Sequence, residues 1–325
     1  MEYRNLGKTG VKVSPVCLGT MTLGREADEA ESFAMMDYFV EQGFNFLDTA
    51  DGYSAGGSEE VVGRWMQERQ NRRDLVVATK VFATMGPGPN DKGLSRLHIQ
   101  MAVEDSLRRL QTDVIDIYQI HRWDFDTPPQ ETLEALNDLV RQGKVRYIAC
   151  SNLSGWQLAQ YLYLADAHLY SRFVSLQQVY NVLNRSAELE VLPLCADQGL
   201  GVIPYNPLGG GVLIGKYRRG EELPSGSRLA GYDTYRDRYL HDEMFDLVDQ
   251  FVDAAREMGV TPAQLVLAWV LGDDRITAPI VGARSLEQLQ DSLQGAAIEL
   301  TAEQRAAVPA VGPGKWVGKD PVYDR

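Results

Sequence analysis

The segment Phe44-Asn45-Phe46-Leu47-Asp48 (residues 44–48) is a short apolar run that ends in a carboxylate. Two later runs have the same form, since residues 75–80 end in Lys80 and residues 114–121 end in His121. Short apolar runs bounded by polar residues are typical of buried strands in a parallel sheet. If the three runs are neighbouring strands, their terminal polar side chains gather at one carboxyl edge, where such folds place their chemistry.

Strand-like and helix-like segments alternate along nearly the whole chain. Residues 13–19 predict a first strand after a small hairpin near residues 7–10, and residues 27–42 carry apolar side chains at helical spacing. Eight strands alternating with helices predict a single (β/α)8 barrel domain over residues 1–325, with extra C-terminal helices. The other strands are expected at 145–150, 173–177, 201–205 and 276–281, and the other helices at 58–69, 99–110, 133–140, 154–165, 186–198 and beginning near 261, 285 and 301.

A doubly wound open sheet is the competing architecture for this alternation. Such a sheet usually carries a G-x-G-x-x-G turn after its first strand, whereas this chain has Leu18-Gly19-Thr20-Met21-Thr22-Leu23-Gly24 there. The barrel is therefore favoured. One long Gly- and Arg-rich stretch, residues 206–237, is expected to be an irregular functional loop.

Composition argues against several classes of function. With 325 residues, 44% of them apolar, the chain has enough apolar side chains for a large core. A net charge of −13 disfavours binding to nucleic acid or an anionic membrane, because both need a basic surface. No apolar stretch is long enough to span a bilayer, and Cys17, Cys150 and Cys195 form no disulfide framework. We expect a cytoplasmic protein whose partner is a small molecule, and its oligomeric state stays open.

Four polar side chains are candidates for shared chemistry at the sheet edge: Asp48, Tyr53, Lys80 and His121. A tyrosine titrates at about pH 10, so it keeps its proton at neutral pH but gives it up poorly. A neighbouring Lys ammonium stabilises the phenolate and lowers its pKa, and Asp48 could hold that lysine by ion pairing. His121 could orient or polarise a carbonyl oxygen. The set suits protonation of an oxygen on which negative charge develops.

A series of motifs runs in order over nearly the whole chain. It consists of Phe46-Leu47-Asp48-Thr49-Ala50-Asp51-Gly52-Tyr53, the strand ending in Lys80, residues 113–121, Gly143-Lys144-Val145-Arg146-Tyr147-Ile148 with Ser151-Asn152, Gln177-Gln178-Val179-Tyr180-Asn181, Pro204-Tyr205-Asn206-Pro207-Leu208 and Ile280-Val281-Gly282-Ala283-Arg284-Ser285. On these motifs the chain resembles the aldo-keto reductases. Within that family it is similar to the bacterial branch related to potassium-channel β-subunits and to sugar and aldehyde reductases.

The resemblance implies a barrel that binds NADPH without a Rossmann domain and reduces aldehydes or ketones by hydride transfer. It implies Tyr53 as the general acid, Lys80 and Asp48 as its tuning pair, and His121 as the orienting group. The nicotinamide carboxamide would meet Ser151, Asn152 and Gln177, with Tyr205 stacked on the ring, residues 206–217 over the pyrophosphate and Arg284 and Gln288 at the 2′-phosphate. The full set of cofactor contacts that it implies is Thr20, Ser151, Asn152, Gln177, Tyr205, Asn206, Pro207, Leu208, Gly210, Lys216, Gly282, Arg284, Gln288, Asp291 and Ser292.

Two departures from the family pattern lie at the adenine end. Gly282-Ala283 stands where many relatives carry Lys-Ser, and Asp291-Ser292 stands where a Glu-Asn pair is common. Arg284 still favours NADPH, because a guanidinium forms charge-assisted hydrogen bonds with phosphate. NADPH is therefore the expected cofactor, with NADH as the less favoured one.

Two other motifs are set aside. Residues 210–216 fit G-x-x-x-x-G-K, but a nucleotide-hydrolysing P-loop needs Ser or Thr next, and Tyr217 stands there. The four histidines show no metal-ligand spacing, so no metal is expected.

The sequence leaves other functions open beside a carbonyl reductase. One is a cofactor-sensing regulatory protein like the channel β-subunits, and another is a lyase or isomerase that uses the same Tyr-Lys pair. The substrate is open too. Candidate walls of its pocket are Met21, Trp123, Tyr180 and Tyr205, and Arg122 is a candidate polar contact.

Overall fold

The computed structural model describes residues 2–323, and these form the (β/α)8 barrel that the sequence predicts. Within this range the main sheet contains eight parallel strands. It closes into a barrel because the N–H groups of Thr277 and Ile280 donate to the carbonyls of Val202 and Pro204. In spatial order the strands are β10 (Ile280–Val281), β3 (Cys17–Gly19), β4 (Phe46–Asp48), β5 (Val76–Val81), β6 (Ile115–Ile120), β7 (Val145–Ser151), β8 (Phe173–Gln177) and β9 (Gly201–Val202).

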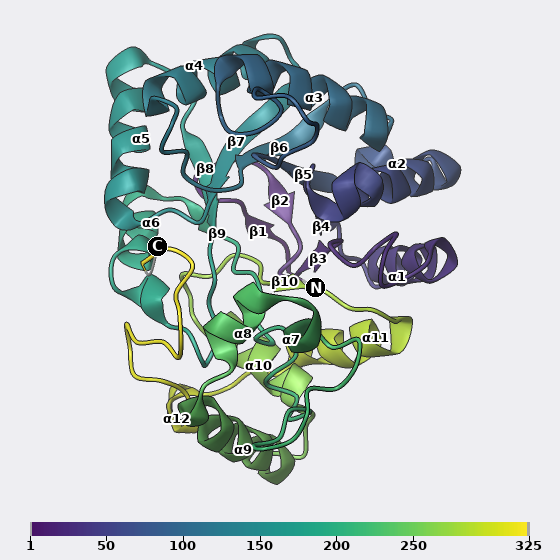
Figure 1. The fold of residues 1–325 in the computed structure, drawn as a ribbon, viewed down its shortest axis with the longest axis vertical. Coiled ribbons are helices and arrows are strands. Elements are labelled where there is room, and N and C mark those ends of the chain that lie inside the picture. Colours follow the sequence, from purple (N-terminus) through teal and green to yellow (C-terminus); the bar gives the residue numbers. More distant parts are fainter. Residues whose placement is uncertain (1, 324–325) are drawn as a thin grey trace.

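Helices surround the strands, and a small hairpin crosses the centre of the view in Figure 1. The hairpin pairs β1 (Arg4–Asn5) with β2 (Lys12–Val13), which confirms the turn expected near residues 7–10. The surrounding helices are α1 (Glu29–Glu41), α2 (Gly57–Arg69), α3 (Arg96–Leu110), α4 (Pro129–Arg141), α5 (Gly155–His168), α6 (Val191–Gln198), α10 (Pro262–Leu271) and α11 (Leu286–Gln294), and α12 (Ala302–Ala307) follows them in the chain.

Capping residues fix where the predicted helices begin. Ser154 with Gln157 forms a capping box at α5, and Thr261 with Gln264 forms another at α10. At α10 the Thr261 hydroxyl accepts the N–H of Gln264, and in both boxes the glutamine Oε1 accepts the N–H of the capping residue. These contacts confirm the helix starts read from the sequence.

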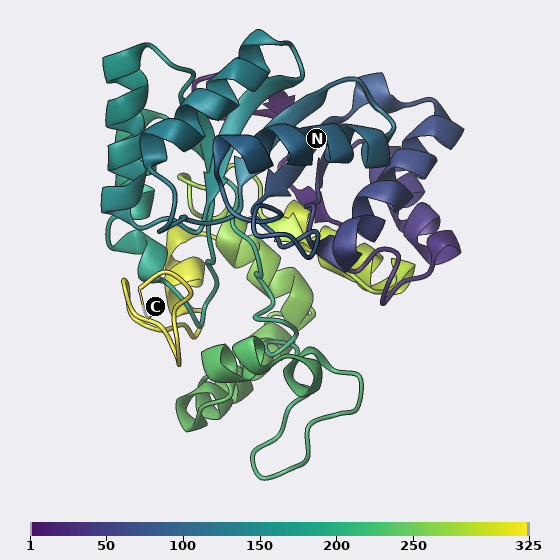
Figure 2. The same ribbon diagram turned by 45° about the horizontal axis from the view of Figure 1, so that its top comes forward.

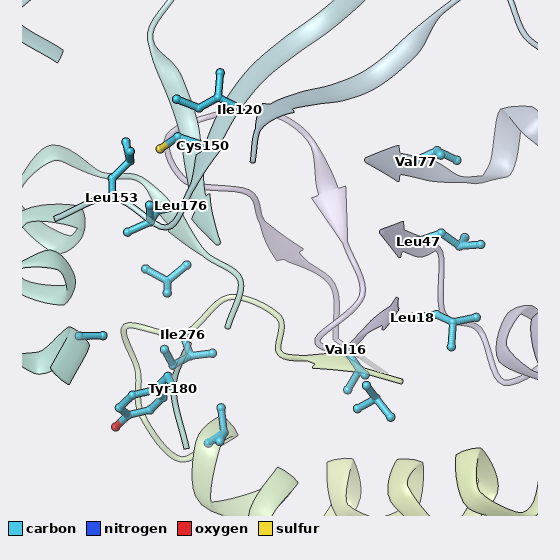
Figure 3. Packing of buried hydrophobic residues seen from close by; sticks show 14 of the residues in the cluster. Val16, Leu18, Leu47, Val77, Ile120, Cys150, Leu153, Leu176, Tyr180 and Ile276 are labelled. Carbon is cyan, nitrogen blue, oxygen red and sulfur yellow. The ribbon is translucent and has the colours of Figure 1, made fainter. Parts of the chain in front are cut away.

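Side chains point alternately to the two faces of each strand, so the buried apolar residues form one core inside the barrel and another between the strands and the helices. Phe46, Ala78, Ile117 and Ala149 belong to one buried cluster inside the barrel, which Leu6 of the hairpin completes. The residues adjacent to these in each strand face the helices, as the paired Leu47 and Val77 do in Figure 3. Because successive side chains point to opposite faces, Asp48 and Lys80 fall on the inner face, above the apolar cluster.

The main difference from the sequence-based expectation lies between β9 and α10. Residues 206–237 were expected to be irregular, but they contain α7 (Arg228–Gly231) and most of α8 (Asp233–Tyr239), and the unpredicted α9 (Asp242–Glu257) follows. Figure 2 shows this excursion standing away from the barrel. Helix α9 forms because apolar side chains at helical spacing give it one face that can be buried. These side chains are Met244, Val248, Phe251 and Ala255.

Smaller differences concern element lengths. The expected helix 186–198 begins as a 3₁₀ turn at residues 186–188 and becomes α-helical only at Val191. Strands β9 and β10 are two residues long, because the neighbouring residues lie where the barrel closes through isolated hydrogen bonds. Within residues 2–323, no helix is long and apolar enough to cross a membrane.

Candidate active site

Asp48, Tyr53 and Lys80 meet at the carboxyl edge of the barrel strands. Lys80 ends up fully buried, and its Nζ lies 2.5 Å from Asp48 Oδ1 and 3.2 Å from Tyr53 Oη. The same ammonium donates to the carbonyl oxygen of Thr49 at 2.8 Å. All three donors of the lysine are therefore directed at oxygen atoms, which fixes the ammonium beside the phenol.

Asp48 receives further hydrogen bonds that the sequence did not indicate. Its Oδ2 accepts from Gln119 Nε2 at 2.9 Å and from Gln177 Nε2 at 2.8 Å. Gln119 comes from β6 and Gln177 from β8, so the carboxylate is held from several sides of the barrel. The sequence analysis did not identify Gln119. A usable signal is its position one residue before the end of β6, where its side chain points into the barrel.

His121 lies beside the phenol rather than within the Asp48 network. The rings of His121 and Tyr53 meet edge to face, with centroids 5.9 Å apart. Burial lowers the pKa of His121 to about 3, and the positive charges of Lys80 and Arg122 add to this effect. The imidazole is therefore neutral at physiological pH.

Burial and the Lys80 ammonium shift the pKa of the Tyr53 phenol in opposite directions. Burial raises the pKa of Tyr53 above its usual value, and Lys80 offsets only part of this increase. The net direction thus differs from the lowering expected from Lys80 alone. Burial lowers the pKa of Lys80, but the charges of Asp48 and Tyr53 outweigh burial and raise it overall, so the ammonium stays protonated.

The loop that carries Tyr53 has an unusual backbone. Ser54 and Ala55 adopt left-handed conformations, with φ of 53° and 52°, and Gly56 follows at 94°. Side chains rarely adopt this region, and each such residue costs on the order of 1–3 kcal/mol. The tight turn places Tyr53 at the start of a 3₁₀ turn directly before α2.

A cavity of about 400 Å³ opens at this edge of the barrel. Its volume lies within the range of roughly 300–1,000 Å³ that is common for small-molecule sites. Asp48 and Tyr53 line it, whereas Lys80 and His121 contact Tyr53 without belonging to the lining. The predicted cofactor contacts that line it are Gln177, Tyr205, Asn206, Pro207, Leu208, Gly210, Lys216, Gly282, Arg284, Gln288, Asp291 and Ser292.

Three predicted cofactor contacts lie outside the lining. Ser151 and Asn152 bond to each other at 2.9 Å, and Asn152 also donates to the His121 carbonyl and accepts from Tyr205 Oη at 2.8 Å. Thr20 is fully buried and bonds to the carbonyl of Asp48 and the hydroxyl of Ser58. The structure thus places Thr20 in support of β4, and its role as a cofactor contact stays a prediction.

The far end of the cavity carries positive charge in an otherwise acidic protein. Lys216, Arg284 and Arg228 all line it, and both arginines lie 3.9 Å from Glu26 Oε1. Sequence reasoning missed Arg228 and Tyr235, because both belong to the stretch that was expected to be irregular. The signal was Ser227, whose side chain caps α7 directly before Arg228.

These residues fit a phosphate-bearing dinucleotide. A Cβ at Gly211 would come within 2.9 Å of Lys216 Nζ, so glycine leaves room for the ammonium at the cavity wall. Lys216 and Arg284 can bind phosphate oxygens, and Tyr205 offers an aromatic face near the Tyr53 end. Asp291, which also lines the cavity, accepts from Thr261 Oγ1 and Gln264 Nε2, so its carboxylate is held in a fixed position. Within residues 2–323, no group of acidic, His and Cys side chains is arranged to hold a metal ion.

Only some of the residues predicted to form the substrate pocket line the cavity. Met21 and Tyr205 line the cavity, and Arg122 lies over the ring of Phe82 at 4.5 Å. Trp123 is largely buried against other aromatic rings. Tyr180 does not belong to the wall: it is fully buried in the outer core and stacks on a tryptophan there, because its position after β8 faces the helices.

Comparisons with known proteins agree with this geometry. The Aldo/keto reductase family model matches residues 15–312. An uncharacterized oxidoreductase of Bacillus subtilis (strain 168), YrpG, is 40% identical over 323 residues and covers 97% of each chain. A probable voltage-gated potassium channel subunit beta of Arabidopsis thaliana is 38% identical over 90% of each chain, and norsolorinic acid reductase B of Dothistroma septosporum is 34% identical over 96% of this chain and 82% of its own. The chain therefore belongs to the aldo/keto reductase family and is an oxidoreductase.

Proposed function

We propose that the protein is an NADPH-dependent reductase that converts an aldehyde or ketone to the alcohol, with Tyr53 as the general acid. The observation that carries the proposal is the contact between a partly exposed phenol and a buried ammonium, 3.2 Å apart, at a cavity of small-molecule size. A phenol so placed is suited to deliver a proton where negative charge develops. When bound, the nicotinamide supplies the hydride to the carbonyl carbon.

The remaining steps belong to the protein's own side chains. Tyr53 Oη gives its proton to the carbonyl oxygen and becomes a phenolate. The adjacent Lys80 ammonium stabilises that phenolate, while Asp48 holds the ammonium in place. Neutral His121 orients the same oxygen through a ring N–H. A proton from water then restores the phenol.

One feature of the cavity favours NADPH over NADH. The cavity end formed by Lys216, Arg228 and Arg284 is cationic, whereas the chain as a whole carries a net charge of −13. A phosphate ester placed there gains charge-assisted hydrogen bonds that an unphosphorylated ribose cannot form. We therefore assign this end to the 2′-phosphate and pyrophosphate.

The test is turnover of a panel of aldehydes and ketones with NADPH and with NADH, in wild type and in Tyr53→Phe. The variant keeps the ring but loses the proton, so kcat should fall by roughly 10²-fold or more while NADPH still binds. The matched control is Tyr163→Phe, because Tyr163 is 71% exposed on α5, away from the cavity lining. Near wild-type turnover in Tyr53→Phe would count against the assignment.

A cofactor-sensing binding role is the second candidate, because one relative is named as a probable channel subunit beta. The two candidates differ in turnover and in partners. A sensor would hold NADPH tightly, fail to turn over any carbonyl of the panel and co-purify with a stoichiometric protein partner from its native host. Turnover without such a partner favours the reductase.

A further inference from the structure

A second buried carboxylate lies in the loop that carries Tyr53. Asp51 is fully buried, and its Oδ1 accepts the N–H of Gly52 at 2.6 Å. Its Oδ2 accepts the N–H of Phe82 at 3.2 Å. Gly52 directly precedes Tyr53, and Phe82 directly follows β5, which carries Lys80. One carboxylate therefore joins the segment of the phenol to the segment of the ammonium.

Other contacts between the two segments reinforce this connection. The N–H of Asp51 donates to the carbonyl of Lys80 at 3.1 Å. A Cβ placed on Gly52 would come within 2.7 Å of Ala83 Cβ, so the two segments pack closely. Left-handed Ser54 and Ala55 follow at once and carry conformational strain. A strained turn keeps its shape only where its surroundings fix it, and Asp51 is the polar anchor at its start.

We infer that Asp51 is a positioning residue that holds Tyr53 beside Lys80, and that its ionised form does so. The inference rests on the proposed role of Tyr53 as the general acid. An ionised carboxylate offers both oxygens as acceptors and makes charge-assisted hydrogen bonds to the two N–H groups. A protonated carboxyl turns one oxygen into a donor that faces an N–H, so one of the two bonds is lost.

The surroundings of Asp51 raise the pKa of its carboxyl group, so that it is protonated under mildly acidic conditions. Glu59 of α2 accepts from Thr79 Oγ1 and from Arg109 Nε of α3. Burial, together with the negative charges of Asp51 and Glu59, raises the pKa of Tyr118 of β6. Burial is the largest influence and, with the negative charge of Glu59, raises the pKa of Asp51 to about 6. The N–H groups of Gly52 and Phe82 and the charge of Arg109 act in the opposite direction. Asp51 thus loses its charge as the pH falls through about 6.

The first test is Asp51→Asn in the full-length protein, with NADPH and the best carbonyl substrate. The amide keeps one acceptor, so we expect kcat to fall at least about tenfold, since small misplacement of a reacting group has such effects. The KM for NADPH should stay within about twofold, because Asp51 does not line the cavity. Wild-type kcat should decline below about pH 6, and this acid limb should be absent from the variant.

Asp116→Asn is the matched control. Asp116 is also a buried carboxylate that accepts a backbone N–H, that of Val77 at 2.8 Å, but it lies near the amino ends of β5 and β6. Its loss should lower stability and leave kcat and the acid limb as in wild type. A merely structural role of Asp51 would give the same result as this control.

Glu59→Gln provides a second variant that keeps the Asp51 carboxylate. Removing the negative charge of Glu59 lowers the pKa of Asp51, so the acid limb should move to lower pH. An unmoved limb, or an Asp51→Asn enzyme with kcat within twofold of wild type, would overturn the inference. The Glu59→Gln result is independent of whether Asp51→Asn folds well.

Amide hydrogen exchange separates this inference from the proposed function. Corrected for intrinsic rates, exchange over residues 49–56 should be faster in Asp51→Asn than in wild type or Asp116→Asn. Equal protection in all three proteins would contradict the positioning role. A wild type without carbonyl turnover would instead refute the proposed function, and the exchange result would still decide whether Asp51 anchors the loop.

Discussion

Gln177 donates a hydrogen bond of 2.8 Å to Asp48 across the interior of the barrel. The two residues come from β8 and β4, which lie four places apart in the ring of eight strands and are therefore diametrically opposed. With Gln119 and Lys80, Gln177 surrounds the carboxylate with donors. The position of the ammonium beside Tyr53 thus depends on the closed barrel and not on one loop.

The buried pair of Asp48 and Lys80 leads to the first prediction. Asp48→Asn leaves a buried ammonium without its counter-charge, which should lower the free energy of unfolding by about 3–5 kcal/mol. Lys80→Met should cost less, because the carboxylate keeps the amide donors of Gln119 and Gln177. Chemical unfolding of both variants measures the difference. Equal losses would show that the two amides contribute little.

Both substitutions should also strongly decrease the rate of carbonyl reduction, for different reasons. Lys80→Met removes the charge that stabilises the phenolate, so kcat should fall by roughly 10²-fold or more. Asp48→Asn leaves Lys80 free to lose its proton or its place. Arg69→Met is a control of similar chemistry, because its ion pair with Asp37 lies on the surface between α1 and α2. It should change kcat little.

His121 gives a prediction for stability against pH. Its folded pKa is about 3, below the ordinary value of 6.5, so between these values the unfolded chain binds a proton that the folded chain excludes. Stability is therefore lost as the pH falls below about 6.5. At about pH 5 this residue should account for about 2 kcal/mol relative to neutral pH.

His121→Gln tests this value, because glutamine does not titrate. Urea unfolding at about pH 7 and about pH 5 should show a smaller acid loss in the variant than in wild type. Asp51 titrates in both proteins, so its effect cancels in the comparison. Identical losses in the two proteins would mean that His121 is not held neutral by the fold.

Arg284 should decide much of the cofactor preference. Its guanidinium lines the cavity and donates to the carbonyl of Gly226, and its main chain N–H bonds to Gln288. Arg284→Ala should raise the KM for NADPH by roughly tenfold or more and leave that for NADH nearly unchanged, since a hydrogen bond to a charged group contributes about 1.5–3 kcal/mol. Arg256→Ala is the control, because Arg256 is an exposed residue of α9 paired with Asp253. An equal change for both cofactors would place the 2′-phosphate elsewhere.

Gly63 tests the packing of α2 against α3. A Cβ there would lie 2.3 Å from the carbonyl oxygen of Arg109 and 2.8 Å from the carbonyl carbon of Leu110. Gly63→Ala should therefore lower the free energy of unfolding by about 1–3 kcal/mol, despite the helical preference for alanine. Gly231→Ala is the control, because a Cβ at Gly231 meets no atom within 4 Å. A stabilised Gly63→Ala protein would show that the helices can separate at no cost.

The sequence by itself determined the barrel and the meeting of its polar strand ends. Apolar runs and helical spacing are properties of chain neighbours, so Phe46, Val77 and Ile117 already indicate buried strands before any contact is known. The carboxyl ends of parallel strands share one edge, which is why Asp48, Lys80 and His121 were predicted to lie together. The family motifs added the predicted cofactor contacts, most of which line the cavity.

Only the tertiary structure decided the hydrogen bonds of Asp48 and the direction of the pKa shift of Tyr53. The bond from Gln177 to Asp48 requires barrel closure, and the raised pKa of Tyr53 reflects burial that outweighs its lysine. The outward position of Tyr180 and the placement of Arg228 at the cavity also depend on segments far apart in the chain. Local patterns encode which residues form a strand or helix, whereas burial and contacts across the barrel exist only once all eight strands have closed.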